Sequence, residues 1–151
     1  MSDALIDPEV ITAQKLAQRA ADHLFDRDPM SRSLGMKIVQ IAPGRATVMM
    51  LVRADMLNGH GSCHGGTLFS LADSAFAFAC NTYNAVTVAA GATIDFLIPA
   101  RQGDELTAIA TELWRSRRSG LYDVAVMNQR QEQVLLFRGR SHQFDGKLIG
   151  D

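Results

Sequence analysis

The residues with the greatest potential for chemistry are one carboxylate and the short glycine-rich sequence before it. Asp73 is the only charged side chain within the run HGGTLFSLADSAFAFACN, which spans residues 64–81. A carboxylate among apolar side chains is costly to bury. It is therefore either a functional base or nucleophile, or a structural group that bonds Ser70 or Ser74 or points to solvent. Spacing alone leaves both interpretations open.

His64-Gly65-Gly66 stands where the apolar run begins. The first N–H groups of a helix have no partner within the helix, and a glycine at that point lets a carbonyl group approach closely. Such donors suit an oxyanion. The alternative is a plain glycine-rich entry into a helix.

The spacing of Gly65 and Asp73 adds a geometric constraint. Eight residues at a rise of ~1.5 Å each separate them by about 12 Å along one helix. One helix cannot direct both groups at the same carbonyl. If both act on one bond, they come from two copies of the helix that run antiparallel across a two-fold axis, so the sequence predicts a homodimer with two equivalent sites.

The predicted helix over residues 64–81 is apolar around most of its circumference. On a helical wheel the polar side chains share one narrow arc: Thr67, Ser70, Asp73, Ser74 and Asn81. A curved sheet wrapped around one central helix would enclose the remainder.

The surrounding elements agree with an α+β domain. Apolar spacing and the Asp7-Pro8 start signal predict a peripheral amphipathic helix over 8–25, which ends at Asp28-Pro29. A hairpin is predicted over 36–52 and a loop over 54–66. Strand-like runs then follow in a mostly antiparallel meander at 86–97, 105–115, 121–128 and 133–144. We expect an N-terminal helical segment at 1–33, one domain at 34–146 and a C-terminal tail at 147–151.

Composition narrows the class of protein. The 151 residues carry a formal net charge of −1, which gives no general attraction for nucleic acid or an acidic membrane. No apolar run reaches the ~18 residues of a membrane span. The start MSDALIDPEV has no leader pattern, and Cys63 and Cys80 make no disulfide framework, so a cytoplasmic location is expected.

Other constellations are less specific. His60, Cys63 and His64 raise the possibility of zinc or of a Cys/His nucleophile, but no third ligand or orienting acid has a diagnostic spacing. Ser70 and Ser74 lack the Gly-x-Ser-x-Gly elbow of serine hydrolases. No metal or cofactor is therefore expected.

The stretch MLNGHGSCHGGTLFSLADSAFAFACN, followed by TIDFLIPA, GLYDVAVMNQ and LFRGRSHQF, resembles the PaaI-type acyl-CoA thioesterases of phenylacetate degradation, within the hotdog-fold superfamily. The resemblance runs from about Leu34 to His142. It implies a hotdog fold and hydrolysis of phenylacetyl-CoA or hydroxyphenylacetyl-CoA in a homodimer or homotetramer. Some relatives have a serine near Val88, where this chain has Ala89 and Ala90.

The resemblance also implies roles for individual residues. Asp73 would be the nucleophile or general base, and the Gly65 N–H the oxyanion donor. His64 would support the loop and the carbonyl, and Asn58 would bond the carboxylate or the water. Substrate contacts would come from the helix face: Gly66, Phe69, Ser70 and Ser74. Independently of the resemblance, the phosphates of coenzyme A need a basic rim on this near-neutral protein, and two clusters are candidates, namely Arg115, Arg117 and Arg118, and Arg138 with Arg140. The alternative is that both clusters are solvated edges. Two other functions stay open, namely a non-catalytic acyl-CoA-binding module and a hydroxyacyl-thioester dehydratase that uses His64.

Overall fold

The computed structural model describes residues 7–150, apart from the side chain of Ile11. Residues 1–6, on which part of the leader prediction rests, and residue 151 of the predicted tail lie outside the described residues. The helices are α1 (Pro8–Asp26), α2 (Pro29–Ser33), the short 3-10 helix η1 (Ala54–Met56) and α3 (Gly65–Cys80). The strands are β1 (Lys37–Ala42), β2 (Arg45–Leu51), β3 (Ala85–Phe96), β4 (Glu105–Arg115), β5 (Ser119–Met127) and β6 (Gln133–Lys147).

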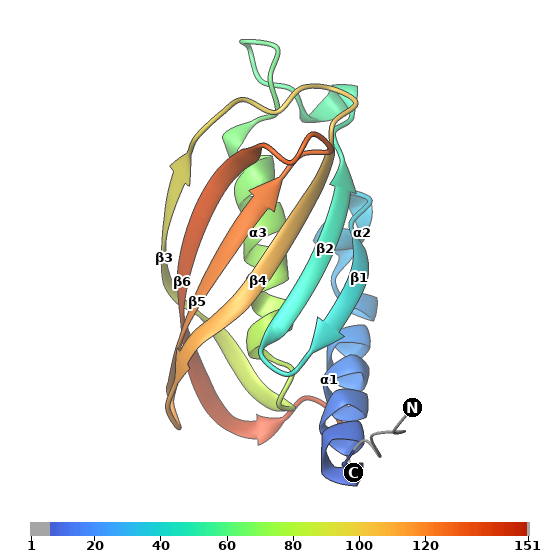
Figure 1. Ribbon diagram of the computed structural model, residues 1–151, viewed down its shortest axis with the longest axis vertical. Helices are drawn as coiled ribbons and strands as arrows, with labels where there is room; N and C mark the ends of the chain where they lie inside the picture. Colours follow the sequence, from blue (N-terminus) through green and yellow to red (C-terminus); the bar gives the residue numbers. More distant parts are fainter. Residues whose placement is uncertain (1–6, 151) are drawn as a thin grey trace, which may run out of the picture.

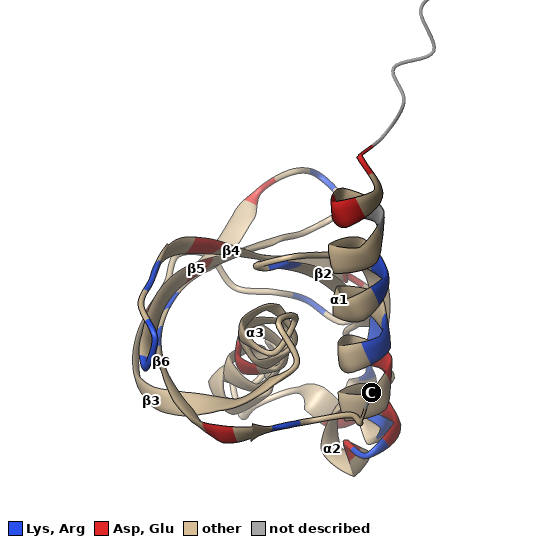
Figure 2. Cartoon of the chain, turned by 90° about the horizontal axis from the view of Figure 1, so that it is seen from below, with Lys and Arg blue, Asp and Glu red and all other residues tan. Residues whose placement is uncertain are grey.

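Helix α3 lies inside a curved antiparallel sheet (Figures 1 and 2). The sheet has six strands in the order β1-β2-β4-β5-β6-β3, and every neighbouring pair is antiparallel. Helix α1 contacts α3 and β1 on the side that the sheet leaves open (Figure 2). The α+β architecture with one enclosed apolar helix is therefore confirmed.

Alternation along the strands produces the inner surface that holds α3. Side chains on β5 alternate between buried and half-buried, with Tyr122, Val124 and Val126 turned inward. On the neighbouring β6, a Cβ at Gly139 would lie 2.9 Å from the Phe76 ring. A side chain there would displace Phe76, so glycine lets the helix pack directly against the strand.

The N-terminal helices follow local signals. The Asp7 carboxylate accepts a hydrogen bond from the Glu9 N–H at 2.9 Å and caps α1, which buries Ala17, Ala20 and Ala21 on one face. The sequence predicts only that Asp28-Pro29 ends this helix. In the structure Asp28 caps the additional short helix α2, because Asp at the N-cap followed by Pro at the first position is itself a helix start.

Strand β3 forms one edge of the sheet and pairs only with β6. Its side chains are mostly exposed, including Val88 and Phe96. A long exposed edge strand presents unpaired backbone groups to another chain. Within residues 7–150, no helix is both long enough and apolar enough to cross a membrane.

Candidate active site

Helix α3 begins with one free backbone donor. The Nδ1 atom of His64, the N-cap residue, accepts from the Gly66 N–H at 2.9 Å. The His64 carbonyl accepts from the N–H groups of Thr67 and Leu68. Among the described residues nothing accepts a hydrogen bond from the Gly65 N–H, so this group can donate to a ligand.

The loop before α3 is held by its own polar groups. The Asn58 Oδ1 accepts from the backbone N–H groups of His60 at 2.9 Å and Ser62 at 3.2 Å. The His64 N–H donates to the Met56 carbonyl at 2.7 Å. Asn58 therefore shapes the loop that carries Gly65. Its expected bond to the carboxylate or to water stays a prediction.

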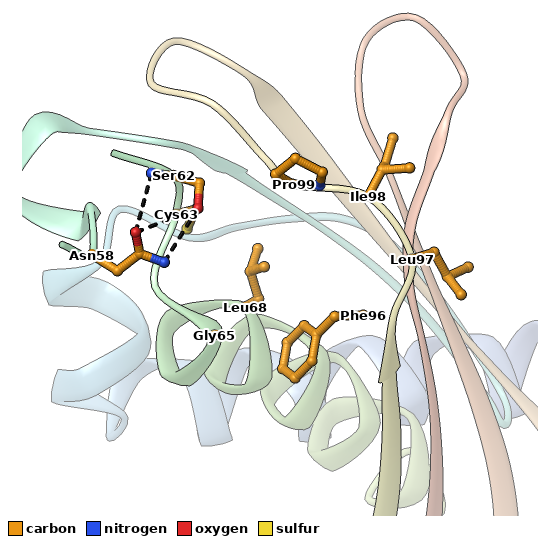
Figure 3. Close-up of a pocket in the computed structure, with 9 residues that line it drawn as sticks. All are labelled: Asn58, Ser62, Cys63, Gly65, Leu68, Phe96, Leu97, Ile98 and Pro99. Carbon is orange, nitrogen blue, oxygen red and sulfur yellow. Dashed lines mark hydrogen bonds between the residues drawn. The ribbon is translucent and has the colours of Figure 1, made fainter. Parts of the chain in front are cut away.

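A cavity of about 350 Å³ opens beside this helix start (Figure 3). Its polar lining comes from Asn58 and Ser62, and Gly65 also borders it. Its apolar lining consists of Cys63, Leu68, Phe96, Leu97, Ile98 and Pro99. A Cβ at Gly65 would lie 3.2 Å from the Phe96 ring, so the free N–H and an aromatic side chain border the same space.

Asp73 lies two turns farther along α3 and is half-buried. Its carboxylate makes no hydrogen bond or ion pair with any described residue. The two neighbouring serines are bonded elsewhere, because Ser70 Oγ donates to the Gly66 carbonyl and Ser74 Oγ lies 2.7 Å from Ser31 Oγ. Burial, and secondarily the negative charge of Asp28, raise the pKa of Asp73. This is a carboxylate available for chemistry.

Within one chain Asp73 does not line the cavity that Gly65 borders. Both groups lie on α3, eight residues apart. Phe69 is partly exposed on the same helix, and its ring packs edge-on against Phe137 with centroids 5.4 Å apart. Gly65 and Asp73 therefore lie at separate places along one helix in the described chain.

The arginine cluster lies at the end of β4 and in the turn that follows it, at the end of the sheet opposite the start of α3 (Figure 1). The Arg115 guanidinium stacks 3.5 Å from the centre of the Tyr83 ring and pairs with Glu112. Arg118 pairs with Asp145 at 3.0 Å. Arg117 is exposed. The fold thus separates these arginines from Gly65 of their own chain.

The competing Cys/His interpretation has little physical support. Burial raises the pKa of the Cys63 thiol to about 11, which keeps it protonated and poorly nucleophilic near neutrality. No cluster of three or more potential metal-binding side chains occurs in the part of the chain that the structure describes.

Two features of the site were not predicted from the sequence. One is the cavity wall formed by Phe96 to Pro99, where the sequence predicts only a strand over 86–97 and a turn at Pro99. The other is the pair Asp28 and Ser31, which contact the Asp73 region although Ser31 and Ser74 are 43 residues apart. The first could have been noticed because an apolar run ends there beside a proline. The second had no local signal.

Comparisons with known proteins show the family of the chain. Residues 60–135, which include Gly65 and Asp73, match the family model of the thioesterase superfamily. The chain is 47% identical to the acyl-coenzyme A thioesterase PaaI of Escherichia coli K12 over 135 residues, which cover 89% of this chain and 96% of that protein.

Solved structures agree as well. The structure of E. coli PaaI, from the phenylacetic acid degradation operon, superposes with a TM-score of 0.88 at 46% identity and covers 89% of this chain and 98% of that one. A mutant of the phenylacetic acid degradation protein PaaI from Thermus thermophilus gives a TM-score of 0.75 at 42% identity, covering 78% of this chain and 100% of that one. A Streptococcus mutans protein bound to acetyl CoA gives 0.71 at 25% identity, covering 74% and 90%.

The fold, an apolar helix enclosed by a curved antiparallel sheet, together with these matches defines a hotdog-fold thioester hydrolase. Within that class, the chain belongs to the PaaI-type branch of the thioesterase superfamily.

Proposed function

We propose that this enzyme hydrolyses aryl acyl-CoA thioesters of the phenylacetyl-CoA or hydroxyphenylacetyl-CoA class to the free acid and coenzyme A. The observation that carries the proposal is the half-buried Asp73 carboxylate, which has no bonding partner among the described residues and a raised pKa. A raised pKa makes a carboxylate a stronger base near neutral pH, as attack on a thioester requires.

The reaction needs a nucleophile and a place for negative charge. Asp73 either attacks the thioester carbon itself or removes a proton from the water that attacks it. The carbonyl oxygen becomes an oxyanion, which the Gly65 N–H stabilises. When this intermediate collapses, the carbon–sulfur bond breaks and the thiolate leaves as coenzyme A. In the nucleophile route, water then cleaves the acyl-Asp73 anhydride.

The two groups belong to different copies of the chain in this proposal. About 12 Å separates eight residues along one helix, so a single α3 does not present both to one carbonyl. The exposed edge strand β3 offers the surface for an antiparallel pairing of two copies. Two-fold symmetry would then set Asp73 of one copy near Gly65 of the other and create two sites per homodimer.

A homotetramer would be formed by two such dimers. Leu51 and Leu136 are exposed on the convex face of the sheet, which is available for this second contact. Within each dimer, the antiparallel pairing through β3 would bring the β4–β5 turn of one copy toward the start of α3 in the other. The cluster of Arg115, Arg117 and Arg118 could then reach the phosphates of coenzyme A from the neighbouring chain.

The cavity chemistry supports an aryl acyl group. Phe96 and Leu68 offer an aromatic and an aliphatic wall next to Gly65, and the volume of about 350 Å³ is near the lower end of small-ligand pockets. His64 keeps its ring fixed through the bond to the Gly66 N–H. Its role, like that of Asn58, would be to orient the donor.

The test measures release of free thiol from phenylacetyl-CoA, hydroxyphenylacetyl-CoA and aliphatic acyl-CoAs. For Asp73→Asn we expect a fall in kcat of at least about a hundredfold, because the variant keeps the shape of the side chain and loses its basicity. Asp26→Asn, an exposed carboxylate of α1, is the control and should keep native turnover. Native turnover in a folded Asp73→Asn variant would refute the proposal, and a product that retains the thioester would indicate a dehydratase.

A further inference from the structure

Helix α2 brings a second carboxylate to the polar arc of α3. The Asp28 Oδ1 caps α2 by accepting from the Ser31 N–H at 2.9 Å, and its Oδ2 accepts from the Ser31 hydroxyl at 2.5 Å. The Ser31 Oγ also lies 2.7 Å from the Ser74 Oγ on α3. Ser31 is completely buried, so this contact is shielded from water.

The directions of these hydrogen bonds follow from the number of protons. Ser31 has one hydroxyl hydrogen and gives it to Asp28, so the Ser74 hydroxyl must be the donor to Ser31. The chain Ser74 to Ser31 to Asp28 therefore ends on an acceptor that is strongest when ionised. The array fixes α2 against α3.

This charged group lies next to the catalytic arc. Ser74 follows Asp73 directly in α3, and the negative charge of Asp28 contributes, after burial, to the raised pKa of Asp73. Other titratable groups facing α3 are Glu112 on β4 and Tyr122 on β5, which are bonded to each other at 2.7 Å.

The other elements around the polar arc of α3 place no buried charged side chain next to it, within the described residues. Cys80, on α3 itself, has a raised pKa, caused mainly by burial and to a smaller extent by the charges of Asp73 and Glu112. The buried side chains of α1, β1, β2, β3 and β6 are uncharged. Asp28 is thus the acidic side chain outside α3 whose charge raises the pKa of Asp73.

We propose that Asp28 is a positioning residue for the reaction: through Ser31 and Ser74 it fixes the face of α3 that carries Asp73, and it keeps a second negative charge beside that carboxylate. The proposal rests on the proposed function of Asp73. Asp28 and Ser31 lie before residues 60–135, the segment that matches the family model. The N-terminal helices would therefore modify the position and the pKa of Asp73, which lies within that segment.

The expected effect has a definite sign. Asp73 acts as a base or nucleophile only when it is deprotonated, so the acid limb of kcat/KM follows its pKa. Removing the Asp28 charge lowers that pKa, and the acid limb moves to lower pH. The deprotonated carboxylate is then a weaker base, so the plateau above the limb falls several-fold.

The experiment records the pH profile of kcat/KM, by thiol release from phenylacetyl-CoA, for the full chain and for Asp28→Asn. Asparagine is also a good N-cap, so this variant removes the charge while it preserves α2. Asp26→Asn removes the same charge two residues earlier and should leave the acid limb in place. A limb that stays in place in Asp28→Asn, while Asp73→Asn is inactive, refutes the positioning role alone. An active Asp73→Asn refutes the proposed function itself.

A second pair of variants tests the tie between the helices and leaves the charge in place. Ser74→Ala removes the donor to Ser31, and Ser74→Thr keeps a hydroxyl at the same atom. We expect kcat to fall several-fold in Ser74→Ala with little change in KM, and Ser74→Thr to restore it. Equal kcat values in both variants would show that the hydrogen bond does not position Asp73.

Discussion

The two ends of helix α3 differ in how their polar groups are used. At its start, the Gly65 N–H has no acceptor among the described residues and borders a cavity. At its end, the side chain of Asn81 donates to the carbonyls of Ala77 and Thr87 and accepts from the Thr87 N–H. One end is available to a ligand, and the other is saturated by the protein.

The saturated end extends into the sheet and the first hairpin. The Thr82 hydroxyl donates to the Ala79 carbonyl and accepts from the Gly44 N–H at 2.8 Å. Glu112 accepts from the hydroxyls of Tyr83 and Tyr122. Gly44 has φ of 71°, and a Cβ there would lie 3.0 Å from the Tyr83 hydroxyl, so this turn needs glycine.

The difference indicates that the two ends of α3 have different roles. Unsatisfied polar groups cost stability, so a free donor persists only where the rest of the structure holds it in place. The C-terminal contacts fix the axis and rotation of α3, which in turn fixes where Gly65 and Asp73 lie. Substitutions at the open end should therefore reduce catalysis, and those at the saturated end should reduce stability.

The largest expected effect is on the free donor. Gly65 is the first helical residue, where proline is tolerated, and His64 has an extended backbone with ψ of 133° that suits a residue before proline. Gly65→Pro removes the N–H and should lower kcat about a hundredfold, since one oxyanion donor contributes ~3 kcal/mol. Thiol release measures the loss.

Gly65→Ala is the matched control. It adds the same Cβ near the Phe96 ring but keeps the donor, so it should retain most of the activity. Mixed dimers of Gly65→Pro and Asp73→Asn chains should regain activity, because one of their two sites has both groups intact. Verified heterodimers without any recovery would contradict the shared site.

An asparagine lies near each end of α3, and replacing each by alanine sharpens the comparison between the two ends. Asn81→Ala leaves a buried N–H and carbonyl of Thr87 without partners, so the free energy of unfolding should fall by about 3 kcal/mol. For a chain of this size that lowers Tm by about 9 °C, while kcat of the folded enzyme stays near native.

Asn58→Ala should show the opposite pattern. Asn58 is half-buried and its contacts lie within one loop, so water can replace them and the change in Tm should be small. The loop delivers Gly65, however, and kcat/KM should fall more than about tenfold. Calorimetry and thiol release on both variants test this, and a larger Tm loss in Asn58→Ala than in Asn81→Ala would reverse the assignment of the two ends.

The sequence predicted those features of α3 that have a local signal. The helix expected over 64–81 spans 65–80 in the structure, because its apolar pattern and its glycine-rich start are local signals. The candidates Gly65 and Asp73 came from the same local pattern. Their shared site in a dimer stays a prediction.

Contacts between distant segments were not predictable from local patterns. The ion pair of Arg118 with Asp145 depends on the register between β5 and β6, and the stacking of Arg115 on Tyr83 depends on where α3 ends. The sequence alone therefore could not show that Arg115 and Arg118 are already paired within the chain. Helix α2 was missed because a five-residue helix has too few positions to show a period.

The smallest effect is expected at Tyr122, inside the saturated end. Burial, and then its hydrogen bond to Glu112, raise the pKa of Tyr122 above the ordinary value near 10. The folded chain therefore keeps this proton at a pH where the unfolded chain loses it. The resulting stability is complete below about pH 10 and decreases as the pH rises above that value.

Tyr122→Phe removes this dependence together with the bond of 2.7 Å to Glu112. At pH 7 the free energy of unfolding should fall by about 2 kcal/mol, because the acceptor is a carboxylate. Above about pH 10 the native chain loses stability through Tyr122 and the variant does not, so the difference between them should narrow. Urea unfolding between about pH 7 and 11 measures both curves, and a constant difference across that range would mean that the Tyr122 proton is not held by the fold.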